Sequence, residues 1–361
     1  MKAKVFTIFT LVIFFAMVLS GAVTAQVPQH TLIEKGEELH PFPTHEGAIQ
    51  QMTDSQAWNV TLIGQISGFA SNIAVAGDYA YVSDEYGGLH IIDVSVPSAP
   101  VEVGFYDTPG YALDVAVVGD YAYVTDWDLR IIDVSSPTSP IEVGFYNTPG
   151  YAINLTVAGK YAYVADDFAG LRIIDVSSPT SPIEVGFNDT QWAMWVTVAG
   201  DYAYVTTSMG SYGRLSIIDV SVPNAPIEVG FYDLGNYPGS VAASGNYAYI
   251  GQYQGLSIID VSVPSAPVCV GYFFLPEYEY ASAVAVAGKY AYVADSFAGL
   301  RIIDVSIPNA PVEVGFYDTT GIDQASDVTV AGNYAFVANG YGGLLILAYT
   351  PYKMHLPLMM R

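Results

Sequence analysis

The segment Leu89-His90-Ile91-Ile92-Asp93-Val94-Ser95 is the strongest indication of the fold, because the chain repeats it five more times in almost the same form. The other copies begin at Leu129, Leu171, Leu215, Leu256 and Leu300, and a degenerate seventh reads Leu344-Leu345-Ile346-Leu347-Ala348. Successive copies lie 40 to 44 residues apart. A period in the low forties, in sequence rich in strand-forming residues, is typical of one propeller blade per repeat. The repeats therefore predict a β-propeller.

Each repeat contains four short segments of alternating residue character, which predict strands a, b, c and d of one blade. In the third repeat we expect these strands at 154–159, 161–166, 171–177 and 183–187. Glycine between strands a and b, as in Gly159-Lys160, supplies the positive φ of a tight hairpin turn. Strands c and d are joined by Ser-x-Pro-x-x-Pro, whose prolines stop the strand. The motif aspartates, such as Asp93, are expected to accept hydrogen bonds in this turn rather than to bind metal.

The strand count predicts how the ring closes. Strands a, b and c occur seven times, whereas a strand d follows a strand c only six times. The missing strand matches Val60–Gly64, which precedes the first strand a. We therefore predict that Val60–Gly64 pairs with Leu344–Tyr349. This pairing closes an all-β, seven-bladed propeller of four-stranded blades and leaves no blade without its outer strand.

Three segments lie outside the predicted propeller, which spans residues 58–350. Residues 1–25 have a basic start, an apolar run and an Ala-Val-Thr-Ala ending, which predict a cleaved signal peptide, with an uncleaved membrane anchor as the alternative. Residues 26–57 are polar and are expected to form a flexible lead. Residues 351–361 form an apolar tail too short to span a membrane. Both interpretations of the N-terminus predict export, and cleavage would leave no segment inserted in a membrane.

Charge limits the choice of partner. The chain has 11 Lys+Arg against 35 Asp+Glu, a formal charge of −24, and loss of Lys2 and Lys4 with the signal peptide would make it −26. Such a field repels phosphate backbones and anionic lipids, so we expect no nucleic-acid partner. Cationic partners, divalent ions or simple solubility fit this charge better. Cys269 is the single cysteine, which excludes a disulfide within the chain.

The Leu-x-Ile-Ile-Asp-Val-Ser copies, together with the Gly-Asp-Tyr-Ala-Tyr-Val hairpins that precede them, resemble the LVIVD-repeat β-propellers of exported bacterial and archaeal proteins. The resemblance covers about residues 58–350, and the seventh copy departs from it with Ala348 in place of aspartate. It implies an extracytoplasmic, surface-associated propeller. It supplies no catalytic motif that could be transferred to residues of this chain.

One rim of the predicted ring is the better candidate for binding. The a–b hairpins and c–d proline turns share a rim and are nearly constant among the repeats, whereas the d–a and b–c loops of the opposite rim vary. Variable loops can serve a ligand, with ordinary drift as the alternative. Flat aromatic rings suit a sugar or a peptide, with packing between blades as the alternative. The candidate ligand-binding residues are Trp127, Trp192, Trp195, Tyr278 and Tyr280.

Polar residues near the axis of this variable rim suggest a metal. The first residues of the seven strands a are Asn72, Asp114, Asn154, Trp195, Ser240, Ala283 and Asp327. Carboxylate and amide oxygens that converge on one opening suit Ca²⁺, and we take Asp114, Asn154 and Asp327 as candidate ligands. Hydrogen bonding to backbone is the alternative role. The aspartates that end strand b, such as Asp126, are expected to bind loop backbone donors.

Catalytic arrangements are scarce in this sequence. Of five histidines only His90 falls within a blade, so neither a Ser-His-Asp arrangement nor a histidine metal cluster can be assembled. We expect a secreted or cell-surface, monomeric, non-catalytic scaffold that binds an extracellular protein or carbohydrate through its variable rim. One alternative is a cation-dependent hydrolase or lactonase-like enzyme with its site at the channel mouth. The other is a purely structural envelope component.

Overall fold

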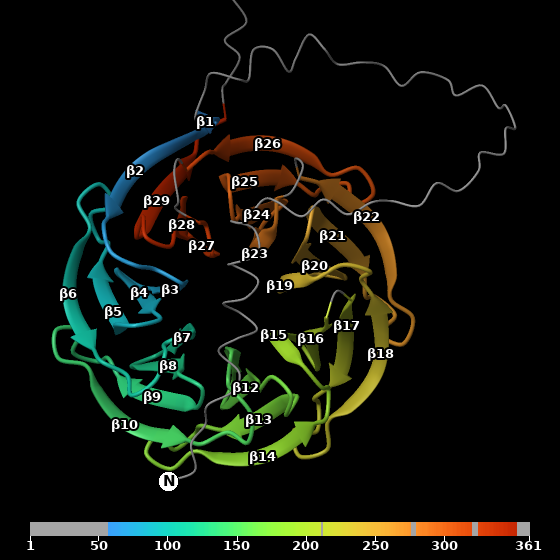
Figure 1. The fold of residues 1–361 in the computed structure, drawn as a ribbon, viewed down its shortest axis with the longest axis horizontal. Coiled ribbons are helices and arrows are strands. Elements are labelled where there is room, and N and C mark those ends of the chain that lie inside the picture. Colours follow the sequence, from blue (N-terminus) through green and yellow to red (C-terminus); the bar gives the residue numbers. More distant parts are fainter. Residues whose placement is uncertain (1–56, 211, 276–278, 320–323, 352–361) are drawn as a thin grey trace, which may run out of the picture. The chain divides into compact units, whose positions relative to one another are not determined.

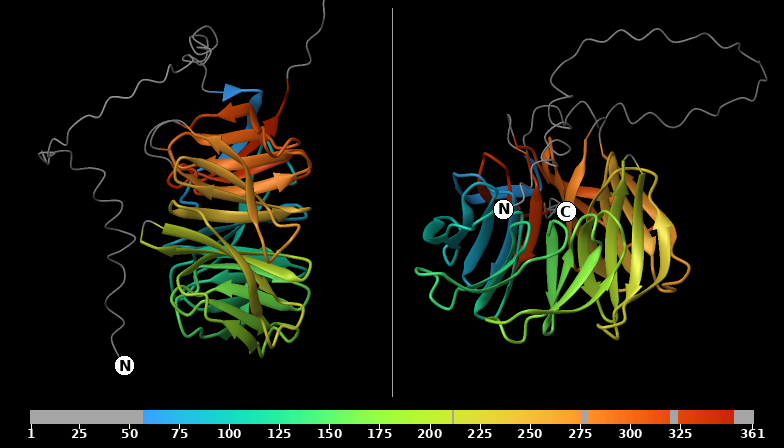
Figure 2. Two further views of the ribbon diagram at one scale, coloured as in Figure 1. Left: turned by 90° about the vertical axis from the view of Figure 1, so that its right-hand side faces the viewer. Right: turned by 60° about the horizontal axis from the view of Figure 1, so that its bottom comes forward.

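The computed structural model describes residues 57–351, except 211, 276–278 and 320–323. These residues form seven antiparallel sheets, arranged as blades around a common axis (Figure 1). Figure 2 shows the ring from the side, with the strands running between its two faces. The described part of the chain contains no helix, and so none that could cross a membrane. The predicted fold, an all-β propeller with seven four-stranded blades, is confirmed.

Six blades use consecutive strands, and strand a lies nearest the axis (Figure 1). Blade 1 has β3 (Asn72–Ala76), β4 (Tyr79–Asp84), β5 (Gly88–Asp93) and β6 (Val101–Tyr106); blade 2 has β7 (Asp114–Val118), β8 (Tyr121–Thr125), β9 (Leu129–Asp133) and β10 (Ile141–Tyr146). Blade 3 has β11 (Asn154–Ala158), β12 (Tyr161–Ala165), β13 (Leu171–Asp175) and β14 (Ile183–Asn188). Blade 4 has β15 (Ala193–Ala199), β16 (Tyr202–Met209), β17 (Tyr212–Asp219) and β18 (Ile227–Asp233). Blade 5 has β19 (Pro238–Ser244), β20 (Tyr247–Gln252), β21 (Gly255–Asp260) and β22 (Val268–Phe274), and blade 6 has β23 (Ala281–Ala287), β24 (Tyr290–Asp295), β25 (Gly299–Asp304) and β26 (Val312–Tyr317).

Blade 7 joins the two ends of the propeller. It consists of β27 (Asp327–Ala331), β28 (Tyr334–Ala338), β29 (Leu344–Tyr349) and, as its outer strand, β2 (Val60–Ile66). The register pairs Val60 with Tyr349 and Ile66 with Leu344, in antiparallel orientation. The predicted pairing of the N-terminal strand with the last repeat is therefore confirmed. It removes the free edge that β29 would otherwise expose.

An additional strand, β1 (Ala57–Trp58), pairs with the outer strand of blade 6. Trp58 pairs with Phe316, and their ring centroids lie 6.4 Å apart. Asn59, with φ of 55°, turns the chain from blade 6 to blade 7. Its Nδ2 donates to the carbonyl of Val314 over 2.8 Å, and its own carbonyl accepts from Thr350 N over 2.7 Å. Strand β1 thus includes Ala57, the last residue of the segment expected to be a lead.

Neighbouring blades interlock through a glycine in each outer strand. A Cβ on Gly144 would lie 2.1 Å from the carbonyl oxygen of Pro179, in the c–d turn of the next blade, so only glycine fits there. Six junctions share this contact: Gly64–Pro97, Gly104–Pro137, Gly144–Pro179, Gly186–Pro223, Gly230–Pro264 and Gly271–Pro308. At the seventh junction, Gly315 faces the carbonyl oxygen of Trp58 instead. Strand β1 therefore occupies the place of the proline turn that blade 7 lacks.

The repeated motif supplies the core. Ile131 and Ile132 point to opposite faces of blade 2, because successive side chains alternate along a strand. Ile131 packs with Leu155 towards blade 3 and Ile132 packs with Ile91 towards blade 1, and all but Leu155 are fully buried. The motif aspartates accept the backbone N–H two residues on, over 2.9–3.0 Å, as expected for the c–d turn. The motif thus fixes both faces and the outer turn of each blade.

Candidate functional site

The residues taken as Ca²⁺ ligands form hydrogen bonds from one blade to the next around the axis. Asp114 Oδ2 accepts from Asn154 Nδ2 over 2.6 Å and from Leu155 N over 2.7 Å. Asn154 Oδ1 in turn accepts from Val196 N over 2.8 Å. Asp327 Oδ2 accepts from Ile73 N over 3.0 Å. The same side chains that the sequence placed near the axis therefore connect the innermost strands of adjacent blades.

Two blades have no side-chain oxygen at this position, because the equivalent residues of β15 and β23 are Trp195 and Ala283. Trp195 packs against the apolar cluster between blades 4 and 5, which contains Leu215 and Val241. Hydrophobic contact thus takes the place of the hydrogen bond at this junction. The structure places Trp195 in packing between blades, the alternative role considered for the rim aromatics.

Burial perturbs the axial carboxyl groups. Burial raises the pKa of Asp114 well above its usual range; hydrogen bonds from Leu155 and Val115 oppose the shift, and the charge of Asp327 adds to it. Burial likewise raises the pKa of Asp327 to about 6. A cation at the axis would have to compete for oxygens that already accept N–H groups. No group of three or more His, Cys, Asp or Glu side chains suited to a metal occurs within the described ranges, and the Ca²⁺ site stays a prediction.

The aspartates that end strand b bind loop backbone, as expected, and those of blades 2, 3 and 6 also pair with an arginine. Asp126 Oδ2 accepts from Gly110 N over 3.0 Å, and both its carboxylate oxygens lie 2.9 Å from Arg130 Nε. Arg130 also lies 3.8 Å from a carboxylate oxygen of Glu142 and 5.2 Å from the ring centroid of Phe145. One arginine thus connects strands b, c and d of blade 2.

Blade 6 carries a more acidic form of this cluster. Arg301 there faces four carboxylates, Asp295, Glu313, Asp318 and Glu279, at 3.4, 3.6, 3.5 and 3.8 Å. Burial, together with the neighbouring Glu279, raises the pKa of Asp295 to about 8. One arginine cannot neutralise four carboxylates, so burial and like charge favour the protonated form of Asp295.

The variable rim carries a row of aromatic side chains, which we call the aromatic arc. In spatial order it consists of Tyr341, Phe69, Tyr86, Tyr111, Trp127, Tyr151 and Phe168, and each ring contacts the next at centroid distances of 5.0–6.3 Å. The residues alternate between b–c and d–a loops of blades 7, 1, 2 and 3, which follow one another around the ring in Figure 1. Tyr86, Tyr341 and Phe168 are 74%, 69% and 47% exposed. The other four are half-buried, so the arc is a continuous, partly exposed aromatic surface.

Backbone contacts hold the arc in place. Trp127 has φ of 75°, in the left-handed region that costs a bulky residue free energy. Its carbonyl accepts from Ala152 N over 3.0 Å and from Thr148 Oγ1 over 3.2 Å. The b–c loop of blade 2 is thereby fixed to the loop that leads into blade 3. The unfavourable conformation of Trp127 is thus maintained by its neighbours.

The other predicted rim aromatics have different surroundings. Trp192 follows the arc on the loop into blade 4 and is 41% exposed. Tyr280 turns inward: its hydroxyl donates to the carbonyl of Pro238 over 2.9 Å, and burial raises its pKa. Tyr278 lies outside the described residues. Of the predicted aromatics, the structure brings only Trp127 into the arc.

The other six members of the arc were not among the binding residues predicted from the sequence. For three of them, Tyr86, Phe168 and Tyr341, a signal was present in the sequence. Six b–c loops carry an aromatic residue at matching positions: Tyr86, Trp127, Phe168, Tyr253, Phe297 and Tyr341. Tyr, Trp and Phe differ in sequence but share a flat ring. Comparing ring-bearing residues rather than identical residues would have found this set.

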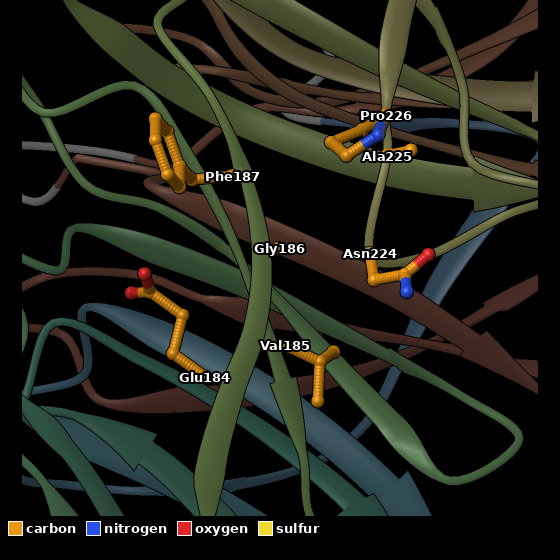
Figure 3. Close-up of a pocket in the computed structure, with 7 residues that line it drawn as sticks. All are labelled: Glu184, Val185, Gly186, Phe187, Asn224, Ala225 and Pro226. Atoms are coloured by element: carbon orange, nitrogen blue, oxygen red, sulfur yellow. The ribbon is translucent and has the colours of Figure 1, made fainter.

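A groove of about 390 Å³ lies on the outside of the ring, between Glu184–Phe187 of β14 and Asn224–Pro226 of the next c–d turn (Figure 3). It follows the Gly186–Pro223 contact between blades. Its one carboxylate, Glu184, already accepts from Tyr146 Oη over 3.3 Å and pairs with Arg172 over 3.4 Å. The groove is thus a product of blade packing, and the arc is the better candidate site.

Comparison with known proteins agrees with the architecture. The LVIVD repeat model matches seven segments: 67–108, 109–148, 149–190, 192–234, 236–273, 279–319 and 323–347. The chain belongs to the LVIVD-repeat family. Its seven family repeats follow the seven blades, including the degenerate last one.

No curated protein sequence matches this LVIVD-repeat chain. Among solved structures, the crystal structure of the computationally designed Ika8 protein is similar, with a TM-score of 0.57 and 5% sequence identity. The match covers 80% of this chain and 98% of the designed one. At this identity the likeness concerns the fold alone.

Proposed function

We propose that this LVIVD-repeat propeller is an exported or cell-surface binding scaffold without catalytic activity, and that its partner binds along the aromatic arc. The observation that carries the proposal is the unbroken contact of seven aromatic rings on the rim whose loops vary. Contiguous exposed apolar surface on a soluble protein typically marks an interaction site. Aromatic side chains are also enriched where binding free energy concentrates.

The fixed loop backbone supports the same proposal. Trp127 and Asp167 both have positive φ. Trp127 forms a backbone bridge to Ala152, in the loop that enters blade 3, and Asp167 forms one to Ala193, the first residue of β15 in blade 4. A surface that is already ordered loses less conformational entropy when a partner binds. Export is supported by the signal-like residues 1–25 and the acidic composition.

The test is a comparison of two triple variants on arrays of peptides and glycans. The arc variant Tyr86→Ala/Phe168→Ala/Tyr341→Ala should lose ligands that the unchanged protein retains. The control Tyr212→Ala/Phe274→Ala/Phe297→Ala removes three rings that are also exposed but lie outside the arc. It should keep those ligands. Array binding that is unaffected by the arc variant, or equally reduced by both variants, would overturn the proposal.

A further inference from the structure

We propose that the partner of the aromatic arc is a linear polypeptide segment bearing lysine or arginine, laid along blades 7, 1, 2 and 3. This inference rests on the proposed function and names the chemistry of its ligand. Three properties of the arc support it: the orientation of the rings, the charge around them and their spacing.

The orientation of the rings favours inserted side chains over stacked sugars. Successive ring planes in the arc meet at 68–82° in five of the six contacts and at 49° between Tyr111 and Trp127. The rings therefore form a ridged surface rather than a common flat platform. A lysine or arginine stem can lie against one ring while its cation meets the negative face of the next.

The charge around the arc is acidic. Glu85 lies close enough to Tyr86 that its negative charge is the main cause that raises the pKa of the tyrosine. Asp107 is exposed on the loop that carries Tyr111, whereas Asp167, next to Phe168, is buried. The nearby arginines are already paired: Arg130 binds Asp126, and Arg172 faces both Asp166 and Glu184. A cationic segment would therefore meet the carboxylates of Glu85 and Asp107 in the part of the arc that lies over blades 1 and 2, which improves its attraction and orientation.

The spacing of the rings fits an extended chain. Side chains on one face of an extended peptide recur about every 6.8 Å, since each residue advances about 3.4 Å. Neighbouring ring centroids in the arc lie 5.0–6.3 Å apart. Alternate side chains of such a peptide can thus contact successive rings.

The experiment measures binding of a short peptide of alternating lysine and serine by calorimetry at physiological ionic strength. A glutamate–serine peptide and a neutral β-linked glucose oligosaccharide serve as comparison probes. We expect the lysine peptide alone to bind. Tyr86→Ala and Phe168→Ala should each weaken it about three- to tenfold, the range for a partly exposed cation–π contact.

Phe297→Ala is the matched control, because Phe297 occupies the same loop position in blade 6, outside the arc, and is 57% exposed. All three substitutions leave the net charge unchanged, so general attraction to an acidic protein would not distinguish them. Equal affinity of all variants, equal loss in Phe297→Ala, or no binding of the lysine peptide would overturn the inference. Binding of the neutral oligosaccharide that Tyr86→Ala abolishes would also overturn it, while the scaffold function would stand.

Discussion

Trp58 should stabilise the closure of the ring far more than its position near the edge of the fold suggests. In blades 1 to 4 the outer-strand phenylalanines, Phe105, Phe145, Phe187 and Phe231, are 45–51% exposed, whereas Phe316 beneath Trp58 is 5% exposed. Trp58→Ala would return Phe316 to the state of its counterparts. Exposing about 40% more of a phenylalanine with roughly 200 Å² of surface would expose about 80 Å² of apolar area. At about 25 cal/mol per Å², this would lower the free energy of unfolding by about 2 kcal/mol.

The contacts of Trp58 itself add to this loss, so we expect Trp58→Ala to lower the free energy of unfolding by about 2–4 kcal/mol. Urea denaturation would show a lower midpoint with an unchanged slope. Trp192→Ala is the matched control, since Trp192 is 41% exposed on a loop, and it should change the midpoint little. Deletion of residues 26–55 should leave the urea midpoint nearly unchanged. Deletion of residues 26–66 should lower it strongly, because this deletion removes β2 from blade 7. Equal midpoints for Trp58→Ala and the unchanged protein would show that Trp58 does not stabilise the closure.

Three further predictions follow from the contacts between blades and from the buried carboxyl groups. Gly144→Ala should lower the free energy of unfolding by about 1–3 kcal/mol, because the new Cβ would lie 2.1 Å from a carbonyl oxygen. Gly315→Ala should lower it less, because its Cβ would lie 3.0 Å from the nearest carbonyl oxygen. Thermal melts that rank the two variants in the opposite order would contradict the role of these glycines in blade packing. The raised pKa values of Asp327, about 6, and Asp295, about 8, mean that the folded state binds these protons more tightly than the unfolded chain. The free energy of unfolding should therefore rise as pH falls from about 8 to about 5. Asp295→Asn should reduce this rise at the upper end of the pH range. A free energy of unfolding that increases with pH across this range would contradict the prediction. If the axial oxygens bind Ca²⁺ as the sequence predicts, calorimetric titration near pH 8 should give a heat of binding that Asp114→Asn abolishes. Absence of heat in the unchanged protein would exclude Ca²⁺ binding at the axis.

The repeats predicted the fold and its closure because each copy must make the same contacts with its neighbours. Ile131 and Ile132 face two different junctions, so their repetition already implied a ring of similar blades. Strand β1 could not be predicted from the sequence, because it has only two residues, occurs once and is defined only by its pairing with β26. The role of Trp58 depends on the proline turn that blade 7 lacks, because the Trp58 carbonyl takes the place of the proline carbonyl at that junction.

The candidate site was less predictable, because it depends on contacts between loops. Trp127 and Tyr280 were both placed on the variable rim, yet one joins the arc and the other bonds inward to Pro238. Nothing in their local sequence separates these outcomes, which depend on the neighbouring loop. At the axis, Asp114 has the chemistry of a cation ligand, but its oxygens accept hydrogen bonds from the adjacent blade. Side-chain type indicated where function was possible, and the packing of blades decided what each group contacts.

The most direct test of binding through the arc is hydrogen–deuterium exchange, with and without a ligand selected on the arrays. Protection on ligand binding should be confined to the b–c and d–a loops of blades 7, 1, 2 and 3, which carry the seven rings. The proline turns on the opposite rim should exchange at unchanged rates. Protection centred on those turns or on the outer strands, with no change in the arc loops, would contradict binding through the arc.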